Sequence, residues 1–257
     1  MRSTLVYDLP TRLFHWLFSG LFLLSFAIAK ITDDESLLFS YHMLSGLMLA
    51  ILVLWRIGWG LFGSQYAKFS EFRLNPLGLK EYFLGILSGS RKRWIGHNPA
   101  SSWAAIIMFC LTLGLAVTGY LMTSGYKESF EDIHEFMANT FIIVVILHVS
   151  GVILHSIRHQ DGIALSMVDG KKEIAELTTM SIRSSRPFAA VLLLALVFSS
   201  GLYIFKNFDS QNRTLTALGQ TLQLGENESE NEEKEYKQTK NNEPAEKNHD
   251  DDEGDDD

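Results

Sequence analysis

Long apolar runs dominate the chain and are separated by polar segments. They occupy residues 13–29, 37–62, 101–123, 133–157 and 187–205. Each run is close to the roughly 20 residues that a helix needs to cross the hydrocarbon core of a bilayer. Backbone groups inside lipid must satisfy their own hydrogen bonds, which favours helices, and no alternating strand pattern is visible in the sequence. The pattern predicts an all-α membrane protein.

The runs divide the chain into four parts. Residues 1–160 hold the first four spans and predict a four-helix transmembrane bundle. Residues 161–186 predict an amphipathic cytoplasmic connection, and residues 187–206 predict a fifth, C-terminal transmembrane helix that Pro187 is suited to begin. Residues 207–257 are expected to form a polar linker and a disordered acidic tail, because their composition cannot bury enough apolar surface.

The acidity of the chain is concentrated in this tail. The last 32 residues, from Glu226, contain fifteen acidic residues and four lysines, a net charge of −11, whereas the whole chain carries −8, which leaves about +3 for the remainder. Lysine and arginine are frequent in the connections 63–100 and 158–186, whereas the loops 30–36 and 124–132 hold one lysine each. The positive-inside rule then predicts a multi-pass membrane protein with a cytoplasmic N-terminus and a tail outside the cytoplasm.

Two further features bear on processing and cofactors. The single cysteine, Cys110, permits neither an internal disulfide nor the C-x-x-C-H attachment of a covalent haem. The first span ends in Ala27-Ile28-Ala29, which also fits the cleavage site of a signal peptide. Cleavage there would remove His15, a candidate cofactor ligand.

Candidate ligands lie within the predicted spans. His134 and His148 are 14 residues apart, so a helix places them on one face, roughly 21 Å apart along its axis. With the topology above, His42 lies at the depth of His134 near the periplasmic side, and His15 lies at the depth of His148 near the cytoplasmic side. Polar groups in the membrane interior are costly and are therefore functional candidates. Two pairs at two depths predict two bis-histidine haems, because haem iron takes axial histidine ligands.

Each of these residues also has a simpler interpretation. A single intramembrane histidine fits a hydrogen-bonded contact between helices, although the set lacks the carboxylates and the His-x-x-x-His spacing of a hydrolytic zinc site. Arg56 is suited to bind a haem propionate, or to serve as an interface anchor whose charge reaches water. Gly46 and Gly151, about one turn from ligand candidates, leave room for a flat macrocycle or for a neighbouring helix.

Several short motifs follow one another along residues 3–172. They are YDLPTRLFHW, SYHMLSG, LVLWRIGWGLFG, GHNPASS, and IHEFMAN with LHVSGV. Together they resemble the bacterial cytochrome b561 family, which is similar to the b-type cytochrome subunits of nickel–iron hydrogenases and respiratory formate dehydrogenases. The resemblance implies a four-helix bundle that holds two non-covalent b haems. It also implies a location in the bacterial cytoplasmic (inner) membrane, which makes the predicted outer tail periplasmic. Carried over to this sequence, the iron ligands are His15, His42, His134 and His148.

The resemblance also implies the exchange of quinone or quinol near one haem. His97 and Asn98 are the candidates for such a site, although Asn98 and Pro99 also suit the start of a helix. The fifth helix and the acidic tail depart from the family pattern, so the resemblance assigns them no role.

We expect transmembrane electron transfer, as part of a respiratory chain, between the membrane quinone/quinol pool and a periplasmic redox protein such as a cytochrome c. The chain would be an electron-transfer subunit that oxidises quinol or reduces quinone within a complex, with no nucleic-acid partner. The acidic tail would steer a basic partner by charge, or serve as a solvated spacer. The alternatives are a membrane transporter or metal-handling protein that uses the intramembrane histidines, and a passive anchor that recruits a partner.

Overall fold

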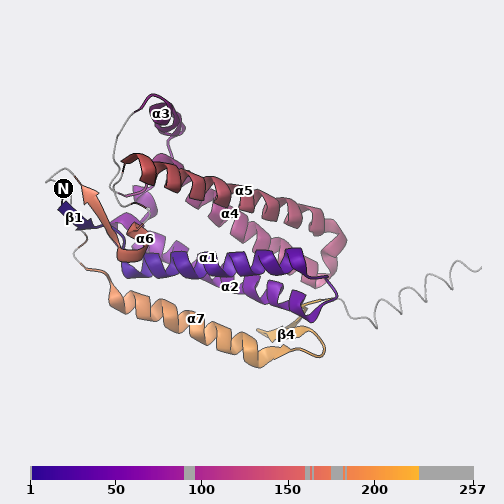
Figure 1. Cartoon of the computed structure of the whole chain (residues 1–257). Helices are drawn as coiled ribbons and strands as arrows, with labels where there is room; N and C mark the ends of the chain where they lie inside the picture. The colour runs from indigo at the N-terminus through magenta and orange to yellow at the C-terminus, as the bar shows by residue number, and fades with distance from the viewer. Residues whose placement is uncertain are drawn as a thin grey trace, which may run out of the picture.

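Long helices make up most of the protein, as the computed structural model in Figure 1 shows. The structure describes residues 2–89, 96–159, 163, 165–174, 182 and 184–225. The long helices are α1 (Leu9–Ile31), α2 (Leu37–Phe62), α4 (Pro99–Leu121), α5 (Lys127–His159) and α7 (Pro187–Asn207). By length and composition these helices are able to cross a membrane, with α4 and α5 counted as one continuous segment. The predicted helical membrane fold with a fifth helix is confirmed.

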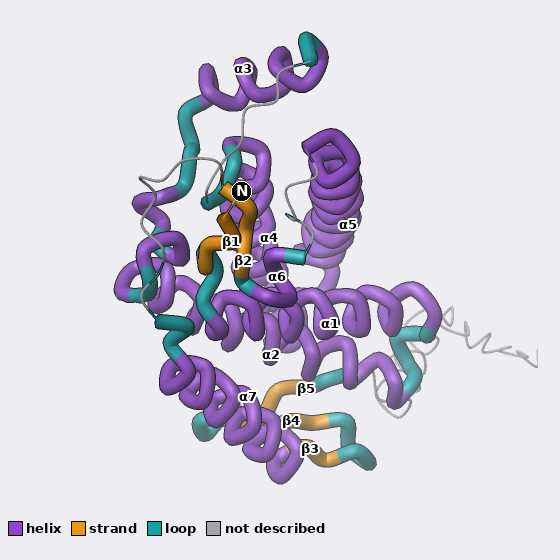
Figure 2. The backbone as a smooth tube through the Cα atoms, turned by 60° about the vertical axis from the view of Figure 1, so that its left-hand side comes forward, coloured by secondary structure: helices purple, strands orange, loops and turns teal. Residues whose placement is uncertain are grey.

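The four helices of the bundle form two hairpins. The short loop after α1 leads back into α2, and the π-helical turn η3 (Met122–Tyr126) leads from α4 back into α5. The hairpins meet mainly through α2 and α4. Helix α7 packs against α1 and α2, on the side away from α5 (Figures 1 and 2).

The bundle has two different ends, which we name by their histidines. The His15 end carries the N-terminus and the elements η1 (Gln65–Ala67), η2 (Phe69–Glu71), α3 (Pro76–Leu87) and α6 (Ser166–Asp169). The His42 end carries the α1–α2 loop and the turn η3. Helix α3 protrudes from the bundle at the His15 end (Figure 1).

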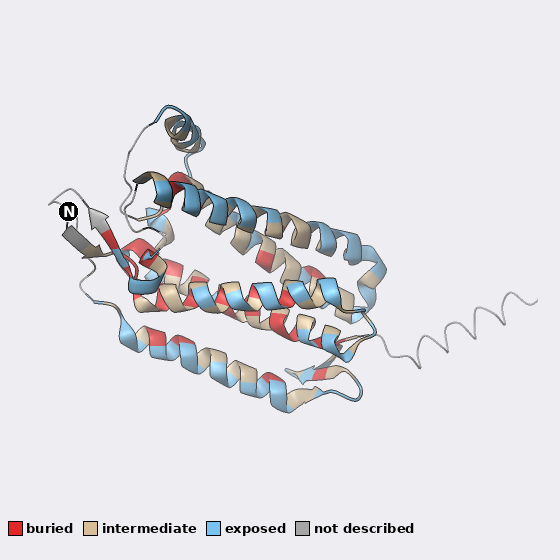
Figure 3. Cartoon of the chain, in the orientation of Figure 1, coloured by how far each residue is buried: buried red, intermediate tan, exposed pale blue. Residues whose placement is uncertain are grey.

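Stacked phenylalanine rings fill the middle of the bundle. Phe141 of α5 is 1% exposed, and its ring lies 4.2 Å from that of Phe22 and 6.2 Å from that of Phe18, both on α1. Leu52 of α2 and Leu193 of α7 are fully buried in the same cluster. Buried positions follow the surfaces where helices meet, as Figure 3 shows. This apolar layer separates the two ends.

A small sheet ties the N-terminus to the segment after α5. Strand β1 (Arg2–Leu5) pairs antiparallel with β2 (Lys171–Ile174), and the turn before β2 is made by Gly170 with a φ of 80°. A side chain at Gly170 would begin 2.6 Å from the carbonyl oxygen of Tyr7, so only glycine fits there. The connection predicted to be amphipathic thus contains α6 and β2. Its residues 161–162, 164, 175–181 and 183 lie outside the described part of the chain.

A second sheet follows α7 where the sequence predicts a polar linker. Its antiparallel strands, in the order β3-β4-β5, are β3 (Phe208–Asp209), β4 (Thr214–Ala217) and β5 (Gln220–Gln223). Leu215 is fully buried whereas its neighbour Thr216 is exposed. Residues 208–225 are therefore ordered against the bundle, and the expectation of a linker there is wrong. The predicted disordered tail, 226–257, lies outside the described residues.

Candidate functional site

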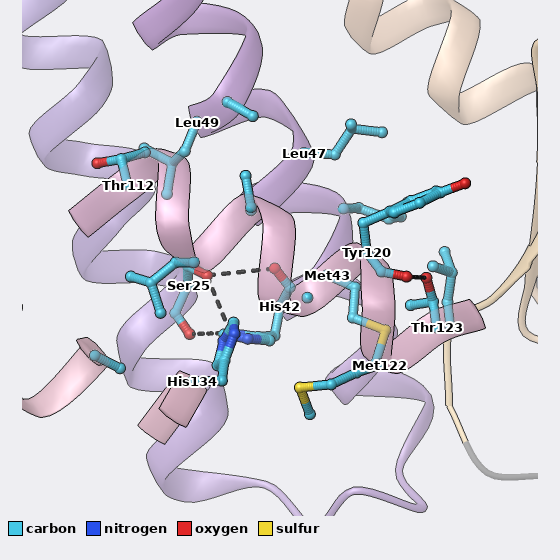
Figure 4. A pocket seen from close by; sticks show the side chains of 18 of the residues that line it. Ser25, His42, Met43, Leu47, Leu49, Thr112, Tyr120, Met122, Thr123 and His134 are labelled. Carbon is cyan, nitrogen blue, oxygen red and sulfur yellow. Dashed lines mark hydrogen bonds between the residues drawn. The ribbon is translucent and has the colours of Figure 1, made fainter. Parts of the chain in front are cut away.

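His42 and His134 face each other across the bundle. Their ring centres are 6.2 Å apart, with an angle of 78° between the ring planes. Both line a cavity of about 210 Å³ between the helices (Figure 4). Two imidazoles on opposite sides of one metal ion have their ring centres roughly 6 Å apart, because each bond is about 2 Å and each ring centre lies about 1 Å beyond its nitrogen. The observed spacing fits two axial ligands of one haem.

Hydrogen bonds hold both rings by the same nitrogen. Nδ1 of His42 lies 2.9 Å from the carbonyl oxygen of Ser25, and Nδ1 of His134 lies 2.8 Å from Oγ1 of Thr118. The Thr118 hydroxyl donates to the carbonyl oxygen of Gly114 at 2.9 Å, so it accepts from the imidazole. A donor at Nδ1 leaves the Nε2 lone pair free for a metal, as is usual for metal-binding histidines.

The cavity wall has room beside the rings. Gly46 lines the cavity one turn after His42, and a Cβ atom built on it would meet nothing within 4 Å. Among the described residues, no group of three or more His, Cys, Asp or Glu side chains is placed to hold a metal ion. Two imidazoles in a mostly apolar cavity suit a haem better than a bare cation.

Two ion pairs fix the first part of α5 against the end of α1 and the loop that follows α1. Lys30 Nζ lies 3.3 Å from Oε1 of Glu135, and Lys127 Nζ lies 3.2 Å from Oδ2 of Asp34. Both pairs are largely exposed to solvent, so they contribute little to stability. Their effect on the site is positional, because Glu135 adjoins His134.

His15 and His148 approach each other at the opposite end. His148 of α5 interacts electrostatically with His15 of α1, and also with His97. Nδ1 of His15 is buried and has no hydrogen-bond partner in the described part of the chain. Gly151, one turn from His148, is exposed, so the empty space at its Cβ position lies on the outside of the bundle. The electrostatic interaction places the predicted partners near each other.

Arg56 lies buried near this second pair. It is 3% exposed, and its Nη2 donates to the carbonyl oxygen of Ala67 at 3.0 Å. The guanidinium carbon lies 5.4–5.9 Å from the centres of three phenylalanine rings, at Phe14, Phe69 and Phe109. Its Nη1 is buried without a hydrogen-bond partner among the described residues. An interface anchor would carry its charge to water, so the buried guanidinium fits the propionate interpretation instead.

His97 lies in an aromatic and basic environment just before α4. Its ring centre is 4.7 Å from that of Phe72 and 5.6 Å from that of Tyr7, and its Nδ1 is buried without a partner within the described residues. Burial, and then the positive charges of Arg56 and Lys172, lower the pKa of His97 to about 3. The imidazole is therefore neutral at physiological pH.

Asn98 behaves differently from its neighbour. Its Oδ1 accepts the backbone N–H of Ser101 at 2.8 Å, and the side chain caps α4. The predicted pair of quinone-site residues thus divides into a helix cap, Asn98, and a partly buried imidazole with an unused nitrogen, His97.

Sequence reasoning missed several residues of the His42 end. Ser25 and Thr118 hold the imidazoles from other helices, 17 and 16 residues away along the chain. Hydroxyls inside apolar spans are the signal that points to them, because they need partners there. Three leucines after α7, at positions 215, 222 and 224, also line the cavity. Nothing local in the sequence connects them to His42.

Comparison with known proteins agrees with this geometry. The family model described as prokaryotic cytochrome b561 matches residues 6–170. The chain is 24% identical over 149 residues to the probable Ni/Fe-hydrogenase 1 B-type cytochrome subunit of Escherichia coli (strain K12), covering 49% of this chain and 63% of that protein. It is also 24% identical over 214 residues to the probable Ni/Fe-hydrogenase B-type cytochrome subunit of Rhizobium leguminosarum bv. viciae, covering 66% of this chain and 89% of the relative. No solved structure matches.

The matched range contains α1 to α6, both histidine pairs, Arg56 and His97, whereas α7 and β3–β5 lie beyond it. The family is one of membrane b-type cytochromes that take part in electron transfer, and it implies a b-type haem. Two facing imidazoles between apolar helices fit that cofactor. The matching family model extends over more than half of the chain, and the protein belongs to the prokaryotic cytochrome b561 family.

Proposed function

We propose that the protein carries electrons across a bacterial membrane through two b haems. One haem is held by His42 and His134, and the other by His15 and His148. The observation that carries this proposal is the 6.2 Å separation of the His42 and His134 rings, each held through Nδ1. When bound, a haem supplies one-electron exchange between ferric and ferrous iron.

The side chains of this protein have separate tasks in that transfer. The four histidines bind and orient the haems, and the unused Nη1 of Arg56 binds a propionate carboxylate at the His15 end. The rings of Phe18, Phe22 and Phe141 keep water out of the layer between the two sites.

Quinone exchange is proposed at the His15 end. A neutral imidazole that lies between two aromatic rings is suited to hydrogen-bond a quinone oxygen, and His97 has a buried Nδ1 free for this. Asn98 is engaged in its cap and supports the site only by beginning α4.

The proposed orientation places the His15 end in the cytoplasm and the His42 end in the periplasm, following the distribution of lysine and arginine. Electrons then pass between the quinone pool and a periplasmic redox partner at the His42 end. A basic cytochrome c fits the acidic tail. A hydrogenase is the second candidate, because the relatives are named as hydrogenase subunits.

The first test is a reduced-minus-oxidised optical spectrum of the purified protein, with extracted haem counted per chain. We expect two haems, and loss of one in His42→Ala or His134→Ala. The matched control is His155→Ala, a buried histidine of α5 that neither pair contains, which should retain both haems. A colourless protein that binds a transition metal would overturn the proposal and support the metal-handling alternative.

A further inference from the structure

The sheet after α7 reaches the cavity of His42 and His134. Leu215, Leu222 and Leu224 line that cavity together with the two histidines. Leu215 is 0% exposed and Leu224 is 3% exposed, so both are buried against the bundle. Their apolar neighbours include Leu44, Leu47 and Met43 of α2. Residues outside the matched family range therefore complete the wall of a site inside it.

Hydrogen bonds attach this sheet to two helices of the bundle. The Ser40 hydroxyl of α2 donates to the carbonyl oxygen of Leu224 at 2.6 Å, and Ser40 is fully buried. The Tyr120 hydroxyl of α4 donates to Oε1 of Gln220 at 3.0 Å. Figures 1 and 2 show the strands lying across the end of α2 and beside α7. The sheet is thus anchored over the cavity by α2 and α4, as well as by its link to α7.

The two faces of the sheet differ in character. Leu215 pairs with Leu222 across β4 and β5, and both side chains belong to the cavity wall. The next pair, Thr216 and Thr221, is exposed. This alternation is that of a strand pair with one buried and one solvated face. A sheet that served only to end α7 would have no need of leucines at the cavity of His42.

We propose that the β3–β5 sheet is the outer wall of the haem site formed by His42 and His134, and that it keeps water from that haem and raises its midpoint potential. The proposal rests on the proposed function, which places a haem there. Ferric haem carries one more positive charge than ferrous haem, so an apolar wall disfavours the ferric form. Opening the wall therefore stabilises the ferric form and lowers the potential.

The test compares two single substitutions in the full chain. Leu222→Ser places a small polar group on the cavity face of β5, and the matched control Thr221→Ala changes the neighbouring residue on the exposed face. The readouts are a redox titration followed optically and the rate of oxidation by ferricyanide, a water-soluble oxidant. The spectral component that His42→Ala removes identifies the haem of the His42 end.

In Leu222→Ser we expect that component to shift to lower potential and to be oxidised faster, while the other component and the Thr221→Ala protein stay unchanged. Unchanged potentials and rates in Leu222→Ser would overturn the proposal that the sheet is the outer wall of this haem site.

Should this variant not fold, Ser40→Ala releases the sheet without altering a cavity side chain. Faster oxidation of the same component is then expected, and an unaltered rate again refutes the proposal. Retention of both haems in His42→Ala would instead refute the haem assignment itself.

Discussion

The two ends of the bundle differ in how far the protein's own residues satisfy the buried polar groups. Among the described residues, eight buried side-chain polar atoms have no hydrogen-bond partner, and all lie at the His15 end. They belong to Thr11, Arg12, His15, Arg56, Ser64, His97, Trp103 and Ser156. At the His42 end both imidazoles are hydrogen-bonded and a sheet covers the cavity. The protein's own residues close the His42 end, whereas the buried polar atoms of the His15 end are suited to bind a polar ligand.

The energetic argument for this interpretation is general. A buried polar atom without a partner costs about 1–3 kcal/mol, so a cluster of them is expensive. Such a cluster is retained where a ligand supplies the missing hydrogen bonds. A haem propionate and a quinone head are both polar acceptors, and they match the unused donors of Arg56 and His97. The following predictions test the contrast, beginning with the largest effect.

Loss of either ligand pair should remove half of the haem, with a different spectral consequence at each end. The ring planes of His42 and His134 are nearly perpendicular, at 78°. Perpendicular axial imidazoles give a strongly anisotropic low-spin ferric signal in electron paramagnetic resonance. We expect His134→Ala to lose this signal and His148→Ala to keep it. Loss of the same signal in both variants would show that the two sites are not independent.

Replacement of Arg56 should affect only the His15 end. In Arg56→Met the proposed contact with a haem propionate would lose its cation, and removal of one partner of a buried charge pair costs roughly 3–5 kcal/mol. We expect weaker retention of one haem and a lower midpoint potential for it, because a nearby cation disfavours the ferric form. The measurements are haem content after dialysis and a redox titration.

The matched control for Arg56 is Lys80→Met, which removes an exposed cation on α3. It should alter neither haem. A change in the component assigned to His42 and His134, rather than to His15 and His148, would place Arg56 at the wrong end and contradict the comparison.

Replacement of His97 should separate quinone chemistry from haem binding. In His97→Phe we expect both haems and normal reduction by dithionite, but loss of reduction by quinol. Because the pKa of His97 is lowered to about 3, its imidazole stays neutral from pH 5 to 8 and contributes no titration there. Protonation below that pKa would place a charge beside Arg56 and Lys172.

Asn98→Asp provides the control for His97, since aspartate also caps helices. Quinol-driven reduction in this variant should match that of the unaltered protein. A loss of the same size as in His97→Phe would show that the Asn98 amide contacts the quinone, against its role as a cap.

The sequence predicted those features that repeat along one helix or follow from the depth of a residue in the membrane. Helical periodicity placed His134 and His148 on one face, and span direction placed His42 and His15 opposite them. In the structure His42 lies near His134, and His15 lies near His148. Apolar runs were sufficient for the five long helices because each needs only its own residues to satisfy its backbone.

Features built from distant segments were not predictable in the same way. Strands β4 and β5 have four residues each, too few for their alternation to stand out in a polar stretch. The hydrogen bonds from Ser25 and Thr118 depend on how α1 packs on α2 and α4 on α5. The difference between the two ends therefore became visible only once the helices were assembled.

The smallest predicted effect concerns the hydrogen bond that orients His134. In Thr118→Val the imidazole loses its acceptor, and a net hydrogen bond is worth about 0.5–1.5 kcal/mol. An Nδ1–H that donates makes the imidazole a stronger ligand and favours the ferric form, so its loss should raise the potential of the His42 haem slightly. A redox titration measures this shift, and Thr118→Ser, which keeps the hydroxyl, should show none. Leu222→Ser is expected to lower the same potential. Shifts of opposite sign in the two variants would therefore distinguish the effect of the hydrogen bond to His134 from the effect of the sheet that covers the cavity.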